Sequence, residues 1–366
     1  MEQTPIFPDL SRTPSSVPAC RSEPSLPHSH SAAYRSSPEI HEDEQYENSS
    51  IAIRPTFNQW IKLIWPDLLT VALLGGAVLP VFLFVPPVGV RVFPLGITTP
   101  DTVKNTSAFV SHALAYPARP QIFSSWVVAV GAIGVPVTII LLLQFWIRSF
   151  WDAHNGILGL VYSLVVSASF GAVIKALVGG FRPTFYDICI PDQAYARGAG
   201  NKTGLNGVGF GEHMWSTDVC TADHNYLFRD SMRSFPSGHS TTSVAAGVYL
   251  LVYLNARLKT FGSRQAPLWK LVMVSLPVLV AVIMCGALVI DNSHNWYDII
   301  AGATIGMLFS IAGYRMVFSG IFDWRVNHIP LIPTWSLEAY PKPDAQLPAC
   351  APVQGLQSNK TTSLIN

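Results

Sequence analysis

The sequence predicts an all-α fold, a six-span transmembrane helical bundle with disordered cytosolic tails at both ends. Of its 366 residues, 49% are hydrophobic and only 12% are charged, a composition typical of a chain that lies in a bilayer. The charges also avoid long stretches of sequence, whereas both ends lack apolar periodicity. The predicted organisation is an N-terminal tail over 1–58, a membrane domain over 59–322 and a mostly disordered C-terminal tail over 323–366.

Six runs with few or no charges predict the spans in order, since about 20 apolar residues of helix cross the hydrocarbon core. The runs are 68–85, 120–147, 156–174, 240–256, 271–290 and 299–322. The fourth run is short, and Arg315 interrupts the sixth, although an arginine near a helix end can reach the membrane surface. Five or seven spans therefore remain as alternatives.

The N-terminal tail is rich in Ser, Pro, His and acidic clusters, which bury too little apolar surface to fold. No apolar core follows Met1, so the first span is expected to act as the insertion signal. The Pro, Lys and Ser residues after about Asn327 indicate a second tail of this kind. A net charge of +1, with no basic run interleaved with aromatic residues, makes nucleic acid an unexpected partner.

The connection between the fourth and fifth spans indicates how the chain is oriented. It carries Arg257, Lys259, Arg264 and Lys270 without an acidic residue, which marks it as cytosolic. An even number of spans then places both termini in the cytosol. The long third connection, 180–235, is expected on the lumenal or extracellular face.

The outward connections contain two candidate glycosylation sites, Asn105 and Asn201, each in an N-x-Ser/Thr sequon. Chance is the alternative, because Asn48 and Asn359 in the predicted cytosolic tails match the same pattern.

Two cysteines, Cys189 and Cys220, share the long third connection. An oxidising compartment would permit a disulfide that closes about 30 residues, with two unpaired thiols as the alternative. No pair of cysteines has zinc spacing, and no carboxylate cluster suits magnesium, so we expect no metal or other cofactor.

A pair of cations follows the third apolar run. Lys175 ends that run, and Arg182-Pro183 comes two helical turns later. Gly179-Gly180 predicts a bend that turns the guanidinium back toward the ammonium. A point charge and a bidentate fork would then hold one phosphate group, whereas anchoring at the membrane surface is the alternative role.

The fourth run opens with Pro236-Ser237-Gly238-His239. Ser237 is placed to cap a helix, and Gly238 lets backbone N–H groups approach a bound oxygen. Helix N-termini bind phosphate for this reason. His239 falls in the first turn, where an imidazole can exchange protons with a leaving alkoxide or a water molecule. A plain N-cap followed by an interfacial histidine is the alternative.

The sixth span is preceded by His294 and begins around Asp298. On a helix that starts near Asn295, the carboxylate would accept the N–H of the imidazole four residues earlier. That bond fixes the tautomer and makes the other ring nitrogen a better nucleophile. A structural hydrogen bond without a catalytic role is the alternative.

Together, Lys-x6-Arg-Pro, Pro-Ser-Gly-His and His-x3-Asp resemble the three-part signature of the type 2 phosphatidic acid phosphatase family, lipid phosphate phosphatase-like membrane proteins. The resemblance covers roughly 60–322. It implies a phosphoric monoester hydrolase that acts on phosphatidic acid, diacylglycerol pyrophosphate or related lipids without magnesium. It implies that His294 becomes a phosphohistidine, that Asp298 orients it and that His239 is the acid and base. The phosphate ligands that it implies are Lys175, Arg182, Ser237 and Gly238.

One departure concerns the third part of the signature, which in the family begins Ser-Arg; this chain has Ala287 and Leu288 there. Loss of the arginine's charge-assisted hydrogen bond would cost about 1.5 to 3 kcal/mol, or roughly 10- to 100-fold in binding or rate. Arg233 is the nearest candidate to replace it in phosphate binding, and Arg229 is another. For both, an exposed loop charge is the alternative.

The sequence favours a lipid phosphate phosphatase whose partners are its lipid phosphate substrate and membrane lipids. The missing arginine motivates a second hypothesis, a protein of the same fold that binds a phospholipid head group without hydrolysing it. A phosphotransferase would use the same intermediate with a lipid alcohol in place of water. A transporter is disfavoured, because the polar groups lie at span ends and not at the midplane. The motifs specify neither the lipid, the organelle nor the oligomeric state.

Overall fold

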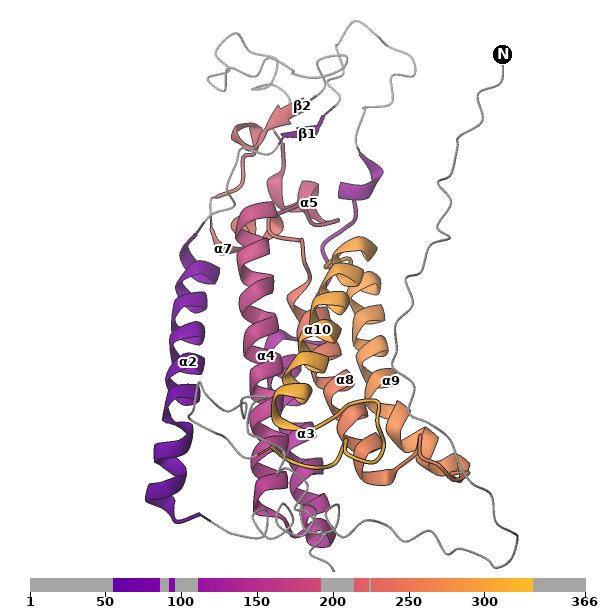
Figure 1. The fold of residues 1–366 in the computed structure, drawn as a ribbon. Coiled ribbons are helices and arrows are strands. Elements are labelled where there is room, and N and C mark those ends of the chain that lie inside the picture. The colour runs from indigo at the N-terminus through magenta and orange to yellow at the C-terminus, as the bar shows by residue number, and fades with distance from the viewer. Residues whose placement is uncertain (1–54, 86–91, 96–110, 192–213, 224, 332–366) are drawn as a thin grey trace, which may run out of the picture. The chain divides into compact units, whose positions relative to one another are not determined.

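The computed structural model describes part of the chain (Figure 1). The described residues are 55–85, 92–95, 111–191, 214–223 and 225–331. The chain divides into two units, Met1–Asn48 and Ser49–Asn366, and the first lies wholly outside the described residues. Asn105 and Asn201, the predicted glycosylation sites, also lie outside them.

Long helices form most of the described chain (Figure 1). They are α2 (Phe57–Phe84), α3 (Ser125–Ile147), α4 (Phe150–Val178), α8 (Gly238–Leu258), α9 (Leu268–Ile290) and α10 (Trp296–Val317). The shorter elements are β1 (Val92–Pro94), η1 (His112–Leu114), α5 (Phe185–Cys189), β2 (Met214–Ser216), η3 (Thr217–Val219) and α7 (Tyr226–Ser231). The predicted helical fold class is confirmed. The antiparallel pair β1–β2 was not predicted, because three-residue strands are too short to show an alternating pattern.

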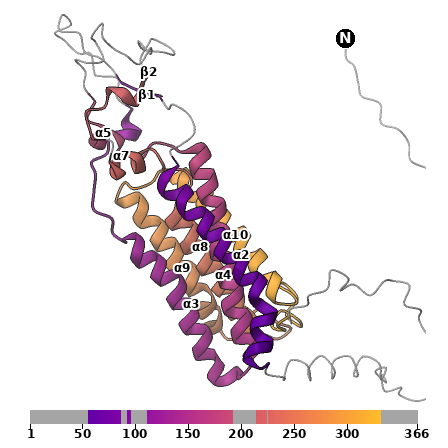
Figure 2. The same cartoon turned by 90° about the vertical axis from the view of Figure 1, so that its left-hand side faces the viewer.

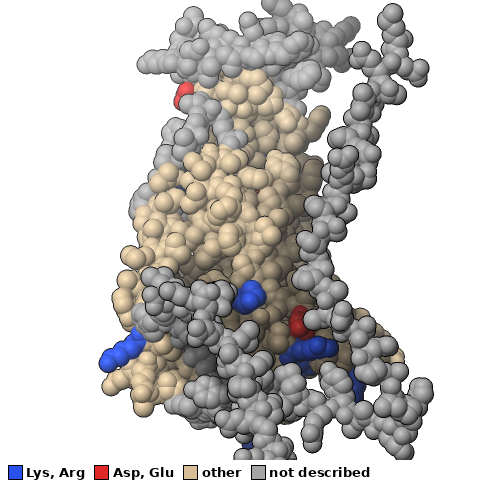
Figure 3. Space-filling model, in the orientation of Figure 1, with Lys and Arg blue, Asp and Glu red and all other residues tan. Residues whose placement is uncertain are grey.

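Five helices in the described chain are long and apolar enough to cross a membrane: α2 over Phe57–Val78, and α3, α4, α9 and α10 over their full lengths. Their outward side chains are large and apolar, such as Trp126 on α3 and Leu268 on α9, which are 79% and 74% exposed. Figure 3 shows one face on which few charged side chains are visible, most of them toward one end. A surface of this kind is stable in lipid.

The sixth long helix, α8, is less apolar and packs against α3, α4, α9 and α10. Because other helices cover most of its surface, it can carry Ser, Thr and Gly where a lipid-facing helix needs large apolar residues. Small residues on α10 allow this helix to pack closely against α8. A Cβ added at Gly306 would lie against the backbone of Thr241 and Ala245 on α8.

The long helices alternate in direction along the bundle (Figure 1, Figure 2). Contacts between helix ends agree with this arrangement. Arg233, just before α8, donates to the carbonyl of Val85 at the end of α2. Ser125 at the start of α3 contacts His239 at the start of α8. The carboxyl ends of α2, α4 and α9 therefore lie with the amino ends of α3, α8 and α10. We call this the motif end, because all three sequence motifs lie there.

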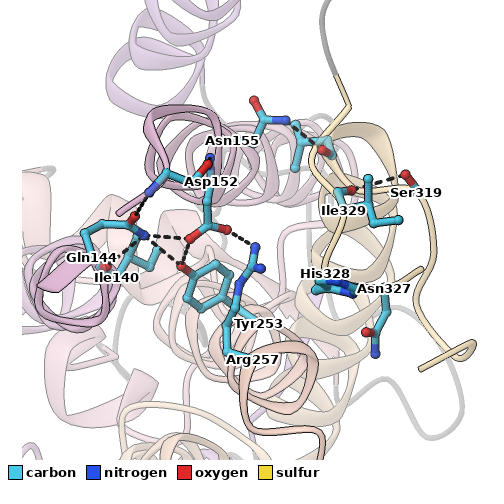
Figure 4. A network of polar contacts seen from close by, with 12 residues as sticks. Ile140, Gln144, Asp152, Asn155, Tyr253, Arg257, Ser319, Asn327, His328 and Ile329 are labelled. Carbon is cyan, nitrogen blue, oxygen red and sulfur yellow. Dashed lines mark hydrogen bonds and ion pairs between the residues drawn. The ribbon is translucent and has the colours of Figure 1, made fainter. Parts of the chain in front are cut away.

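At the opposite end, a buried ion pair joins α4 to α8 (Figure 4). Asp152 pairs with Arg257 and also accepts hydrogen bonds from Tyr253 Oη at 2.8 Å and Gln144 Nε2 at 2.6 Å. The Arg257 guanidinium lies over the rings of Tyr253 and Phe318. Burial removes water from both charges, and the ion pair and the hydrogen bonds offset the free energy that this costs. The network holds α3, α4 and α8 together.

The chain after α10 folds back onto the bundle. Ser319 N donates to Ile329 O at 3.0 Å, and Leu331 N donates to Val317 O at 2.9 Å. The buried Tyr314 Oη donates to Asn327 O at 2.7 Å. The tail predicted from residue 323 thus begins with a packed stretch. These contacts join residues that carry no periodic pattern, which is why the sequence did not indicate them.

Candidate active site

A cavity of about 580 Å³ opens at the motif end. Five of the predicted site residues line it: Lys175, Arg182, Gly238, His239 and His294. The structure thus brings together side chains that are separated by more than 100 residues in the sequence. Among the described residues, no group of three or more His, Cys, Asp or Glu side chains could hold a metal ion.

Lys175 is buried in the last turn of α4, and the chain bends after it as the glycine pair predicted. Gly179 and Gly180 have φ values of 62° and 126°, which favour glycine. Their carbonyls accept hydrogen bonds from Phe235 N at 3.0 Å and Ser234 N at 2.9 Å. Backbone hydrogen bonds therefore join the segment that holds Lys175 and Arg182 to the segment that leads into Pro236-Ser237-Gly238-His239.

Three hydrogen bonds to other described residues hold Arg182. Its Nη2 lies 2.8 Å from Asp230 Oδ2, its Nε donates to Asp230 O at 3.1 Å, and its Nη1 donates to Ser293 O at 2.9 Å. These contacts use three of the five N–H bonds of a guanidinium and leave two for a ligand. Asp230 was missed in the sequence, because nothing in the local pattern distinguishes it from an exposed acid.

The N-terminus of α8 forms another wall of the cavity. Ser237 caps the helix by accepting from Ser240 N, and its own N–H donates to Asp298 O at 3.0 Å. Ser237 is fully buried and does not line the cavity, so its side chain shapes the helix end instead of facing a ligand. Gly238 is exposed to the cavity, and a Cβ there would meet nothing within 4 Å. The helix end is therefore open to an anion.

His239 follows in the first turn of α8, half-buried in the cavity wall. Its Nε2 lies 3.3 Å from Ser125 Oγ at the start of α3. Ser125 could not be assigned a role from the sequence, since the contact joins segments 114 residues apart. The hydroxyl orients the imidazole at the cavity surface.

His294 and Asp298 face each other, but not through the direct hydrogen bond that was predicted. His294 Nδ1 lies 3.8 Å from Asp298 Oδ2, beyond hydrogen-bond distance. Ser234 Oγ contacts both, at 3.3 Å from Nδ1 and 2.5 Å from Oδ2. The carboxylate also accepts from Asn295 N at 3.0 Å as part of a capping box on α10, which keeps it over the helix end. The hydroxyl therefore bridges the imidazole and the carboxylate.

The surroundings of His294 favour a neutral imidazole. The residue is buried between α9 and α10, and this burial lowers its pKa. The Asp298 carboxylate opposes that effect, whereas the positive charges of Arg182 and Lys175 lower the pKa further. A neutral ring retains the lone pair that a nucleophile needs.

The two arginines considered as substitutes for Leu288 do not line the cavity. Arg233 donates from its guanidinium to the Val85 carbonyl, and its backbone oxygen accepts from Lys175 Nζ at 2.8 Å. Arg229 is exposed on α7. Leu288 itself is buried, at 3% exposure.

A disulfide joins Cys189 at the end of α5 to Cys220 after η3, with a Cα–Cα distance of 4.8 Å. It lies in a small apolar core of the motif end, beside Phe185, Trp215 and Phe228. This core holds α5 and α7, and so supports Asp230 and its contact with Arg182.

Comparison with known proteins identifies the family. A model of the PAP2 superfamily matches residues 156–321. Lipid phosphate phosphatase 2 of Arabidopsis thaliana is 30% identical over 210 residues, which cover 57% of this chain and 67% of that protein. This chain belongs to the PAP2 superfamily. The family prediction is thereby confirmed.

Other PAP2 relatives match over similar regions. A PA-phosphatase related-family protein of Dictyostelium discoideum is 30% identical over 225 residues, 61% of this chain and 65% of that protein. Diacylglycerol pyrophosphate phosphatase 1 of Saccharomyces cerevisiae is 30% identical over 170 residues, 46% of this chain and 54% of that protein. The chain thus matches less than two thirds of the length of these two relatives. No solved structure matches the chain.

Proposed function

We propose that this PAP2 protein is a lipid phosphate phosphatase that works without a metal ion. The observation that carries the proposal is that one cavity is lined by the histidines and cations of the three sequence motifs: His294, His239, Lys175 and Arg182. Ser234 and a buried carboxylate support one of the histidines from behind. A site that only bound anions would not need this arrangement.

In the proposed reaction, His294 attacks the phosphorus atom through Nε2, because Nδ1 faces Ser234. The bond from phosphorus to the lipid oxygen breaks, and His239 gives the departing oxygen a proton. His239 then takes a proton from the water that cleaves the phosphohistidine and releases phosphate. Lys175, Arg182 and the N-terminus of α8 stabilise the charge on the phosphoryl oxygens.

An apolar cavity of about 300 Å³ supports a lipid as the leaving group. It lies between α3, α8 and α9, and Val128 lines both this cavity and the polar one. A phosphate in the polar cavity could therefore keep its acyl chain in apolar surroundings. Phosphatidic acid and diacylglycerol pyrophosphate are the proposed substrates, and the name of the yeast relative supports the second.

We also propose that α8 is the sixth span and that the membrane domain covers 59–322. The alternating helix directions support six spans, since α8 connects the motif end to the opposite end as its neighbours do. The positive connection between α8 and α9 supports a cytosolic location for that opposite end and for both termini. The cavity would then face the lumen or the extracellular space.

A head-group binder of the same fold is the second candidate, and the departure at Leu288 favours it. A lipid phosphotransferase, which would share the phosphohistidine, is the third. Product analysis separates them: a phosphatase releases inorganic phosphate, a transferase moves it to an alcohol, and a binder does neither.

The test is phosphate release from phosphatidic acid in membranes treated with EDTA. We expect release by the wild type and only background release by His294→Ala. The matched control is His112→Ala, since His112 is exposed in η1 and does not line the cavity. Equal release by the wild type and His294→Ala at matched expression would refute the phosphatase, and loss of release in EDTA would refute metal independence.

A further inference from the structure

A short segment before α3, residues 116–122, crosses the motif end; we call it the strap. It bonds to both motif segments on either side of the cavity. Its contacts are Tyr116 N to Pro183 O at 3.1 Å, Ala118 N to Asp187 Oδ2 at 2.9 Å, Asn292 Nδ2 to Pro117 O at 3.3 Å and Ile122 N to Asp291 Oδ2 at 3.3 Å. The strap therefore connects the chain after Arg182 to the turn before His294.

Arg119 lies on the strap and lines the polar cavity together with Lys175 and Arg182. Its Nη1 donates to Ile290 O at 3.3 Å, at the last residue of α9. Leu288 is two residues earlier on the same helix. The guanidinium thus contacts the last turn of α9, the same turn that carries Leu288 in place of the arginine of the family signature.

The charge of Arg119 is available to a ligand. Among the described residues it takes part in no ion pair. The carboxylates that line the cavity have other partners: Asp230 pairs with Arg182, and Asp291 accepts from Ser293 N and Ile122 N. Within the described part of the chain, the guanidinium donates only to Ile290 O, which leaves four of its N–H bonds for phosphoryl oxygens.

We infer that Arg119 binds the phosphate of the substrate and supplies the cation that Leu288 does not. The inference rests on the proposed function and deepens it. A guanidinium binds two phosphoryl oxygens in a bidentate manner, so Arg119 completes a set of three cations with Lys175 and Arg182. Its place on the strap, outside residues 156–321, means that the compensating cation comes from outside the region that matches the family.

The experiment compares phosphate release by Arg119→Ala with release by Arg229→Ala. Both variants remove an exposed arginine at the motif end, but only Arg119 lines the cavity. We expect Arg119→Ala to lower kcat/KM roughly 10- to 100-fold and Arg229→Ala to leave it within about 2-fold. Equal activity of these two variants would overturn the inference.

Rescue separates phosphate binding from a structural role of the strap. Leu288→Arg places an arginine at the family position, and we expect it to recover most of the activity that Arg119→Ala loses. Should the double variant fail to accumulate in the membrane, added guanidinium ion should partly restore Arg119→Ala. A loss that neither route restores would overturn the inference.

The same assay includes His294→Ala. This variant separates a failure of the role inferred for Arg119 from a failure of the proposed phosphatase function. Wild-type release that depends on His294 while Arg119→Ala stays fully active refutes the inference alone. Wild-type release no higher than that of His294→Ala refutes the proposed function, and the inference with it.

Discussion

The hydroxyl of Ser234 bridges the two groups that the sequence predicted to contact each other directly. Because the 3.8 Å gap between His294 Nδ1 and Asp298 Oδ2 is too long for a hydrogen bond, the orientation of the imidazole depends on the serine. Ser234 is a positioning residue in this account. It holds the histidine for attack without touching the phosphate.

Substitution Ser234→Ala should therefore lower kcat roughly 10-fold and leave KM unchanged, because it removes the hydroxyl that bonds to both His294 and Asp298 and so orients the nucleophile. The measurement is steady-state phosphate release. Ser169→Ala is the control, since that hydroxyl bonds only within its own helix in the described structure, to Val165 O at 2.7 Å. A raised KM at unchanged kcat would contradict the positioning role.

The pH dependence of kcat/KM tests the electrostatic environment of His294. Arg182 helps to lower the pKa of His294, since its positive charge disfavours an imidazolium nearby. Arg182→Gln should raise that pKa, so the acidic limb of the profile should move to higher pH, whatever the loss in rate. Arg229→Gln serves as the control and should not move it. An acidic limb that stays in place or moves to lower pH would contradict the assignment.

Among the site residues, the sequence predicted those that belong to short motifs and missed those that reach the site through contacts between distant segments. Lys175, Arg182 and His294 could be recognised because their spacing within one segment carries the chemistry. Asp230 and Arg119 could not, because each is a single charged residue whose role depends on which segments pack together.

Among the elements, α8 and α10 position the site by their close packing. The N-terminus of α8 bonds to that of α10 through Ser237 N and Asp298 O at 3.0 Å. Gly306 lies farther along α10, where a side chain would meet the backbone of Thr241 on α8. A helix backbone cannot yield as a flexible side chain can, so a larger residue must separate the two helices.

Gly306→Val should accordingly destabilise the protein by about 1 to 3 kcal/mol and lower its activity. The measurement is the temperature of half-inactivation in detergent. Gly286→Val is the matched control, because a Cβ at Gly286 would meet nothing within 4 Å. Equal inactivation temperatures for the two variants would contradict the packing argument.

The apolar runs predicted some helix ends well, as for α3, which ends at Ile147 as expected. Other ends were missed. The helix α2 begins at Phe57, eleven residues before its apolar run. The helix α4 begins at Phe150, six residues before its run, because its first turns hold Asp152 for the buried ion pair. The apolar content of α8 is low because protein surrounds it, so its sequence resembles a membrane span least.

For the whole molecule, the proposed orientation places the cavity and the positive connection on opposite sides of the membrane. In sealed microsomes with the cytosolic face outward, trypsin should cut at the exposed Arg264, and Arg264→Gln should remove that cut. Arg229, at the motif end, should be protected until detergent is added. A cut at Arg229 in intact microsomes would contradict the proposed topology.

The proposed reaction requires His294 to carry the phosphoryl group between the two steps. The most direct measurement is rapid acid-free quenching after mixing the protein with phosphatidic acid labelled in its phosphate. We expect a base-stable, acid-labile label on His294 in the wild type and no label in His294→Ala. A wild type that releases phosphate without forming such a label, or a label that persists in His294→Ala, would contradict it.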